Sequence, residues 1–172
     1  MAVANTKSTI VTNADATPVT LTNAYLSGGR LRSAAATVEA AAADDAESVY
    51  RFFRVHSSWR IHRLWLASDA ITTMSTADVG LYDVAAVNSG AVISGQVAHF
   101  ASGVDISSAT ALTDVTYEAT VTDKDEVESR LWERLDLSTD PDKWYDICVT
   151  ATTNGPTAAG TISMLMEYSD NT

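Results

Sequence analysis

From Gly28-Gly29 onward the sequence is divided into short segments rich in β-branched and aromatic residues, and turn-forming residues separate these segments at fairly even intervals. This pattern is typical of a β-sandwich or barrel. It predicts an all-β, antiparallel fold with strands over residues 30–40, 48–56, 60–71, 78–85, 92–100, 113–121, 144–152 and 160–168.

The alanine-rich stretch 34–43 has high intrinsic helix propensity, so local preference alone favours a helix there. Two features favour a strand instead: the alternation of Leu31 and Ser33 before it, and the acidic turn 44–47 that leads straight into Val49. We therefore predict a strand that continues through this turn as a hairpin. The turn residues of loop 154–160 predict a similar hairpin before the last strand.

The segment 59–66 mixes polar and apolar residues on both of its alternating faces, which predicts a central strand or one at a subunit contact. Aromatic and aliphatic residues separate the arginines of this region. We expect the outward, solvated or ion-paired face of paired strands to carry them, with a protein contact as the alternative: Arg51, Arg54, Arg60 and Arg63.

One short helix is predicted at about 124–136. Thr122 is suited to cap it, and acidic residues follow at its N-terminal end. Val127, Leu131 and Leu135 fall on one stripe, and Pro141 lies beyond its end. Such a helix would cover one open end of the sandwich.

Residues 1–24 contain few large apolar groups and cannot bury enough surface to order themselves. We expect an arm over residues 1–27 that is disordered in the free protein and lies along a neighbouring subunit by adding a strand. Residues 28–172 then form the sandwich domain. The sequence contains no apolar stretch of membrane-spanning length and no signal-peptide pattern, which predicts a soluble protein.

The chain has 22 acidic and 11 basic residues and a formal net charge of -11. Such a surface repels phosphate backbones, so direct nucleic-acid binding is not expected. The single cysteine, Cys148, lies in an apolar run and is interpreted as a small buried hydrophobe.

No catalytic, cofactor-binding or metal-ligating residues are predicted. The histidines His56, His62 and His99 form no metal-binding pair, although the first two are placed to meet across a tight turn. No nucleophile elbow, P-loop, dinucleotide fingerprint or zinc-protease motif is present. Turn and strand-end roles are expected for the carboxylates that a glycosidase pair would need, namely Asp69, Asp78, Asp83 and Asp105.

Two further features have a structural and a binding interpretation. The acidic turn 44–47 lacks the glycine and alternating oxygen ligands of a calcium loop, so a solvated turn is favoured. The tryptophans lie within apolar patterns, and core or interface positions are favoured over a sugar-binding platform for Trp59, Trp65, Trp132 and Trp144.

The order of several segments carries a resemblance to a known family: 49–55, 61–71, 78–83, 100–109, 130–133, 137–141, 145–147 and 158–162. Over residues 28–168 this order resembles a family of small proteins encoded near the major capsid gene of tailed phages, similar to jelly-roll cement (decoration) proteins. The resemblance implies a jelly-roll-like sandwich with no catalytic residues. It also implies dimers or trimers, made in the host cytoplasm, that sit on the outer capsid surface and tie neighbouring major capsid subunits together.

Two rival functions remain open. A carbohydrate- or receptor-binding module of a phage tail or fibre would share the sandwich but would expose aromatic side chains. An enzyme would need a deep pocket with convergent titratable groups.

Overall fold

A computed structural model of the chain describes residues 13, 15–18, 20, 30–84, 96–117 and 127–170. The chain divides into two units, Met1–Arg30 and Leu31–Thr172, and every described strand belongs to the second. Most of the predicted arm lies outside the described residues. The division into an arm (1–27) and a sandwich domain (28–172) therefore stays a prediction.

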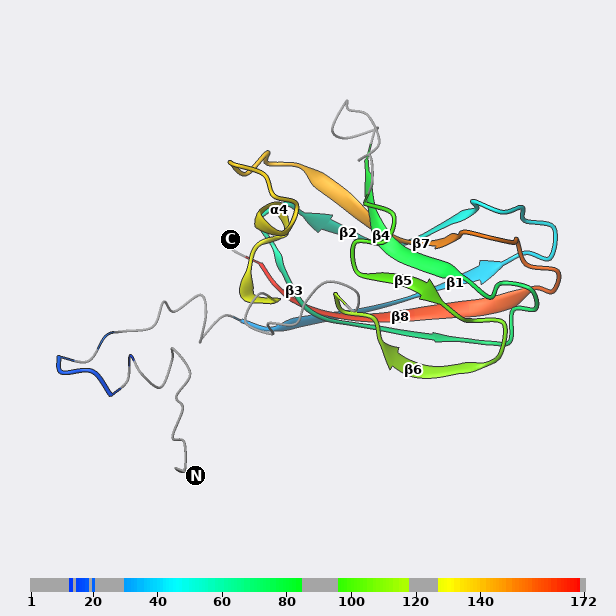
Figure 1. The fold of residues 1–172 in the computed structure, drawn as a ribbon, viewed down its shortest axis with the longest axis horizontal. Helices are drawn as coiled ribbons and strands as arrows, with labels where there is room; N and C mark the ends of the chain where they lie inside the picture. The colour runs from blue at the N-terminus through cyan, green and yellow to red at the C-terminus, as the bar shows by residue number, and fades with distance from the viewer. Residues whose placement is uncertain are drawn as a thin grey trace, which may run out of the picture. The chain divides into compact units, whose positions relative to one another are not determined.

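The second unit is a two-layered antiparallel sandwich, as predicted (Figure 1). One sheet has the strand order β1-β8-β3-β6, with bounds Arg32–Ala40, Gly160–Ser169, Arg60–Ser68 and Thr110–Asp114. The other has the order β2-β7-β4-β5, with bounds Val49–His56, Trp144–Ala151, Ala77–Asp83 and Ala101–Val104.

The pairing of the strands is nested. β4 pairs with β5, β3 with β6, β2 with β7 and β1 with β8, and β3–β8 and β4–β7 pairings complete the two sheets. This is the strand order of a jelly roll, in which a long double-stranded ribbon wraps around one core. The predicted jelly-roll-like fold is confirmed.

The wrapping overturns both predicted hairpins. β1 and β2 belong to different sheets, and so do β7 and β8. The turn residues at 44–47 and 154–160 therefore carry the chain from one layer to the other. Turn residues indicate that the chain reverses direction, but they do not determine which strand becomes the neighbour.

The core lies between the two sheets and is built from their inward-facing side chains. Fully buried aliphatic residues of this kind each stabilise a fold by about 1.5–3 kcal/mol relative to exposure. Strands from both layers contribute large members of this core, among them Leu64, Leu66, Leu81, Ile147 and Ile162.

The alanine-rich segment is strand β1, as predicted. It pairs with β8 from Arg32↔Tyr168 to Ala40↔Gly160 without a register shift. Ala34, Ala36 and Val38 pack against the core, while the alternate residues are exposed. Sheet pairing and burial of one face therefore outweigh the helix propensity of alanine.

β3 lies between β8 and β6, which confirms the predicted central position. A register shift between Ile61 and Arg63 changes the phase of the strand. Because of this β-bulge, Ile61 and Leu64 are both buried although they are three residues apart. The outward placement predicted for Arg60 is wrong: it is 5% exposed, and its Nε donates to the carbonyl of Glu128.

The predicted helix at 124–136 is reduced, within the described residues, to α4 (Leu131–Arg134). Arg130 is extended, with φ -69° and ψ 154°. The amide of Leu131 donates to the carbonyl of Trp59 (2.8 Å), and that of Trp132 donates to the carbonyl of Ser57 (3.0 Å). Bonds to the β2–β3 turn thus replace bonds to the preceding helical turn. The proposed cap, Thr122, lies outside the described residues.

Two predicted strands, 92–100 and 113–121, differ from the structure in their described parts, and residues 92–95 and 118–121 lie outside the described residues. Residues 96–100 form a turn beside β4. The amide of Leu81 donates to the carbonyl of Gln96, and the amide of Phe100 donates to the carbonyl of Val79, with a distance of 2.9 Å in both bonds. β5 begins only after this turn. β6 ends at Asp114, and residues 115–117 do not continue the strand. There the hydroxyl of Thr116 accepts from the amide of Leu64 (2.6 Å) and takes the place of a strand neighbour.

Candidate functional site

Strand β7 is buried on both of its faces. Ile147 and Val149 belong to the core. Because side chains alternate along a strand, Asp146, Cys148 and Thr150 point to the outer face of the sheet. These three residues are nevertheless buried, and β7 lies in the middle of its sheet, between β2 and β4. The middle of this sheet's outer face is therefore made of buried side chains and is not fully exposed to solvent.

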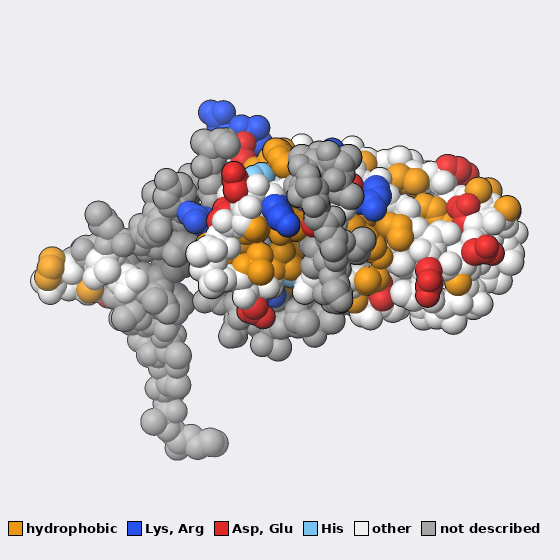
Figure 2. All heavy atoms as spheres, turned by 90° about the horizontal axis from the view of Figure 1, so that it is seen from above, with side chains coloured by type: hydrophobic (Ala, Val, Ile, Leu, Met, Phe, Trp, Pro, Cys, Tyr) orange, Lys and Arg blue, Asp and Glu red, His pale blue; other side chains and the backbone are white. Residues whose placement is uncertain are grey.

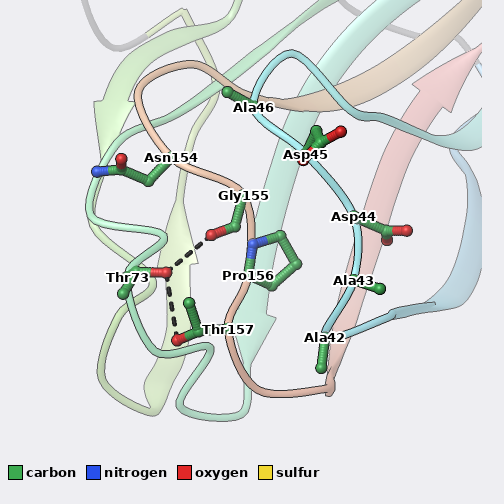
Figure 3. A pocket seen from close by; sticks show the side chains of 10 residues that line it. All are labelled: Ala42, Ala43, Asp44, Asp45, Ala46, Thr73, Asn154, Gly155, Pro156 and Thr157. Atoms are coloured by element: carbon green, nitrogen blue, oxygen red, sulfur yellow. Dashed lines mark hydrogen bonds between the residues drawn. The ribbon is translucent and has the colours of Figure 1, made fainter.

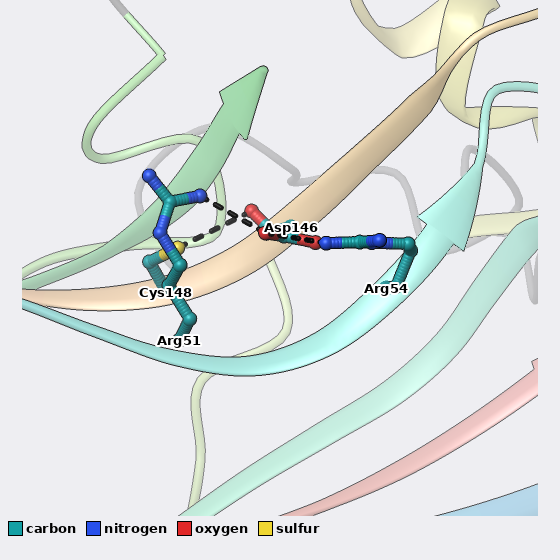
Figure 4. Close-up of polar contacts among 4 residues, drawn as sticks. All are labelled: Arg51, Arg54, Asp146 and Cys148. Carbon is teal, nitrogen blue, oxygen red and sulfur yellow. Dashed lines mark hydrogen bonds and ion pairs between the residues drawn. The ribbon is translucent and has the colours of Figure 1, made fainter. Parts of the chain in front are cut away.

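Two arginines of β2 meet the carboxylate of Asp146 on this outer face. Arg51 Nη1 lies 3.0 Å from Asp146 Oδ2, and Arg54 Nε lies 3.0 Å from Oδ1. Figure 4 shows the two guanidinium groups approaching the carboxylate from different sides. The hydrogen bond to Asp146 raises the pKa of Arg54, and the negative charge of that carboxylate acts in the same direction. We call these three residues the Arg–Asp cluster.

A β-bulge makes the Arg–Asp cluster possible. The register between β2 and β7 shifts between Arg51 and Phe53. Residues three apart in a regular strand face opposite sides. The extra residue, Phe52, returns Arg54 to the side of Arg51.

The Arg–Asp cluster presents positive charge to solvent. The side chains of Arg51 and Arg54 are 49% and 51% exposed, whereas that of Asp146 is 8% exposed. A hollow of about 350 Å³ adjoins them, lined by Arg51, Phe52, Phe53, Arg54 and Asp146. Figure 2 shows this face from above: basic side chains lie among apolar ones near its middle, and acidic side chains gather at its right-hand end.

Cys148 lies beside the Arg–Asp cluster and is fully buried, as predicted. Burial raises the pKa of its thiol to about 12. A thiolate is needed for nucleophilic attack, so this thiol is unsuited to catalysis at neutral pH. Its neighbour across the sheet is Gly80. A Cβ at Gly80 would lie 2.0 Å from the carbonyl oxygen of Val97, so only glycine allows this close approach.

A second hollow, of about 390 Å³, lies at the loop end of the sandwich. It runs between the loops 42–46 and 154–157 and beside Thr73, whose hydroxyl donates to the carbonyl of Gly155 over 2.7 Å (Figure 3). Asp44 accepts hydrogen bonds from the Tyr50 hydroxyl (3.0 Å) and the Ala41 amide (2.9 Å). Within the described ranges, no group of three or more metal-ligating side chains is placed to hold an ion.

The three histidines have separate partners. His56 Nδ1 lies 2.8 Å from the hydroxyl of Ser58, and His62 Nε2 lies 2.9 Å from that of Ser169. His99 is largely buried, and burial, together with the positive charge of Arg134, lowers its pKa to about 4. Among the described residues, His56 and His62 therefore have no ligand in common.

The four candidate carboxylates have the predicted turn and strand-end roles. Asp69 and Asp105 directly follow β3 and β5, and accept backbone hydrogen bonds from Thr161 (3.2 Å) and Ser107 (2.9 Å). Asp78, the second residue of β4, accepts from the amide of Gly103 (2.8 Å). Asp83 ends β4 and lies 3.8 Å from Lys143 Nζ.

The four tryptophans form no exposed row. Trp59, Trp65, Trp132 and Trp144 are all partly buried. Trp59 stacks on Tyr168 with ring centroids 4.7 Å apart and meets Trp144 edge-on at 5.7 Å. These contacts agree with the predicted core or interface positions. In the part of the chain that the structure describes, no helix is long and apolar enough to cross a membrane.

No protein-family model matches the sequence, and no curated protein matches it. Among solved structures, a chain of the capsid of Ralstonia phage GP4 aligns with a TM-score of 0.55 and 13% identity, over 84% of this chain and 86% of that chain. The fold is similar to that of a phage capsid chain. A chain of the capsid asymmetric unit of cyanophage Pam1 aligns with a TM-score of 0.45 and 13% identity, over 83% of this chain and 86% of that chain.

Sequence reasoning identified the arginines of β2 but missed their partner. Asp146 is separated from Arg54 by 92 residues. Only the register between β2 and β7 brings the two together. A strict alternation of faces along β2 would also place Arg51 and Arg54 on opposite sides, because it does not include the bulge at Phe52.

Proposed function

We propose that this chain is a non-catalytic structural protein of a phage particle, which binds the outer capsid surface and bridges neighbouring major capsid subunits. The observation that carries the proposal is the jelly-roll fold, similar over 84% of the chain to a chain of a phage capsid. A protein that binds only the assembled shell stabilises that shell by mass action.

The outer face of the sheet β2-β7-β4-β5 is the capsid contact in this proposal. The chain is strongly acidic overall, with a formal net charge of -11, yet the Arg–Asp cluster presents two half-exposed guanidinium groups there. Guanidinium groups bind carboxylates with paired, charge-assisted hydrogen bonds. The partner surface on the capsid is therefore expected to offer acidic side chains.

The experiment measures co-sedimentation of the purified protein with expanded, undecorated heads of the phage that encodes it. Wild-type protein should saturate the heads at a fixed number of copies. The triple variant R51Q/R54Q/D146N removes the three charges of the Arg–Asp cluster together, so no buried charge is left unpaired. We expect it to fold and to bind heads at least about tenfold more weakly, because two charge-assisted contacts are lost.

The matched control is R63Q/E167Q, which removes the 3.9 Å ion pair of Arg63 and Glu167 in the opposite sheet. It should bind heads as the wild type does. Equal losses in both variants would contradict the assigned contact face. Failure of the wild type to bind heads, together with saturable binding on a glycan array, would replace the capsid proposal with the tail-module alternative.

A further inference from the structure

The four edge strands of the sandwich differ in how well they are protected against pairing with another strand. β5 has four residues and β6 has five, and the pairing of each with its neighbour includes a register shift. β2 carries the bulge at Phe52 and two arginines. Short length, bulges and charges are the usual means by which proteins block an edge.

β1 is neither short nor bulged, and its charged residues lie only near its two ends. It is nine residues long, all nine pair with β8 in one continuous register, and its centre, residues 33–38, contains no charged residue and no proline. Within the described residues, no strand lies on its other side. In an antiparallel strand, every second residue directs its backbone N–H and C=O groups to the side away from a given neighbour. β1 therefore presents a regular row of backbone donors and acceptors.

The two ends of β1 carry opposite charge. Arg32 is its first residue and forms an ion pair with Asp170, with 2.8 Å between the two groups. Glu39 lies near its end and is followed by the exposed acidic residues Asp45 and Glu47. An antiparallel copy of the same strand would place each basic end beside the acidic end of its partner.

We propose that β1 pairs antiparallel with β1 of a second copy about a twofold axis. The two four-stranded sheets then join into one continuous sheet, and both cores lie on the same side of it. The outward-facing side chains near the centre, Ser33, Ala35 and Thr37, are small and exposed, so they leave room for a neighbouring strand. This dimer is independent of capsid binding and would exist in the absence of heads.

The test measures the mass of the protein in solution by sedimentation velocity over a concentration series. Wild-type protein should be a dimer. Ala35 is exposed near the proposed axis, so A35K places like charges close together in the dimer while a lone subunit accommodates the lysine in solvent. We expect A35K to weaken the dimer at least tenfold. The matched control A111K makes the same exposed change on β6, the opposite edge of the same sheet, and should remain dimeric.

A mixture of two variants tests the antiparallel arrangement. A35K and A35E should each dimerise at least tenfold more weakly than the wild type when alone. They should form a mixed dimer when combined, because residue 35 of one copy lies near residue 35 of the other. A monomeric wild type, a dimer that A35K leaves unchanged, or a mixture that stays monomeric would each overturn the proposal. Binding to heads is measured in a separate experiment, so the outcome for the dimer does not decide whether the proposed capsid function is correct.

Discussion

Arg54 Nε lies 3.0 Å from Asp146 Oδ1, across a register shift that places Arg54 on the same side of β2 as Arg51. Asp146 is buried and accepts hydrogen bonds from both arginines. Its carboxylate therefore holds the two guanidinium groups in place while they remain half exposed. A preformed positive site on an acidic chain loses less entropy on binding than two free side chains would.

Substituting Asp146→Ala should lower the free energy of unfolding by about 1–2 kcal/mol, because hydrogen bonds to two charged groups are lost but both arginines remain accessible to water. Urea unfolding followed by tryptophan fluorescence measures the change. Asp45→Ala, at an exposed position of the acidic turn, serves as the control and should change stability little. Equal effects of the two substitutions would show that the Arg–Asp cluster does not contribute to stability.

Substituting Gly80→Ala should destabilise the sandwich by about 3 kcal/mol, because the new Cβ would collide with backbone rather than with a movable side chain. The carbonyl oxygens of Val97 and Gln96 would lie 2.0 and 2.2 Å from it. Gly103→Ala is the comparison: Gly103 has φ +69° but nothing within 4 Å of a Cβ, so backbone strain alone should cost about 1 kcal/mol. Thermal melting of both variants tests the difference, and a larger loss for Gly103→Ala would contradict it.

The sequence predicts the sandwich well because its signal is local: alternating apolar residues and turn formers mark most of the strands. The sequence-based prediction fails where a contact with a residue distant in the chain determines the position of a side chain or the end of an element. Arg60 is drawn inward by the carbonyl of Glu128, and the predicted helix is shortened because Trp59 and Ser57 accept the amides of Leu131 and Trp132. The same limit hides Asp146 as the centre of the Arg–Asp cluster, since strand register is not a local property.

Stability should fall between pH 7 and pH 5, and His99 should account for about 2 kcal/mol of that fall. Burial lowers the pKa of His99 to about 4 in the folded state, whereas an unfolded histidine titrates near 6.5. Between these values the unfolded chain takes up a proton that the folded protein does not, so acid favours unfolding. Urea unfolding of wild type and His99→Gln at both pH values measures this contribution, and an identical fall in the two proteins would rule it out.

Deleting residues 1–27 should leave the melting temperature of the isolated sandwich nearly unchanged, because the described strands all begin at or after Arg32. The deletion should weaken attachment to heads, since we propose that the arm gains order by pairing with a capsid or sister subunit. Calorimetry and co-sedimentation on the same preparations give both quantities. Unfolding of the truncated domain, or unchanged affinity for heads, would show that these residues are not a tether.

Cryo-electron microscopy of heads saturated with the purified protein tests the central proposal most directly. We predict density for the jelly-roll sandwich on the outer surface, spanning joints between neighbouring major capsid subunits, with the sheet β2-β7-β4-β5 facing the shell. Bare joints on heads incubated with an excess of folded protein, or density confined to the tail, would contradict the proposed capsid function.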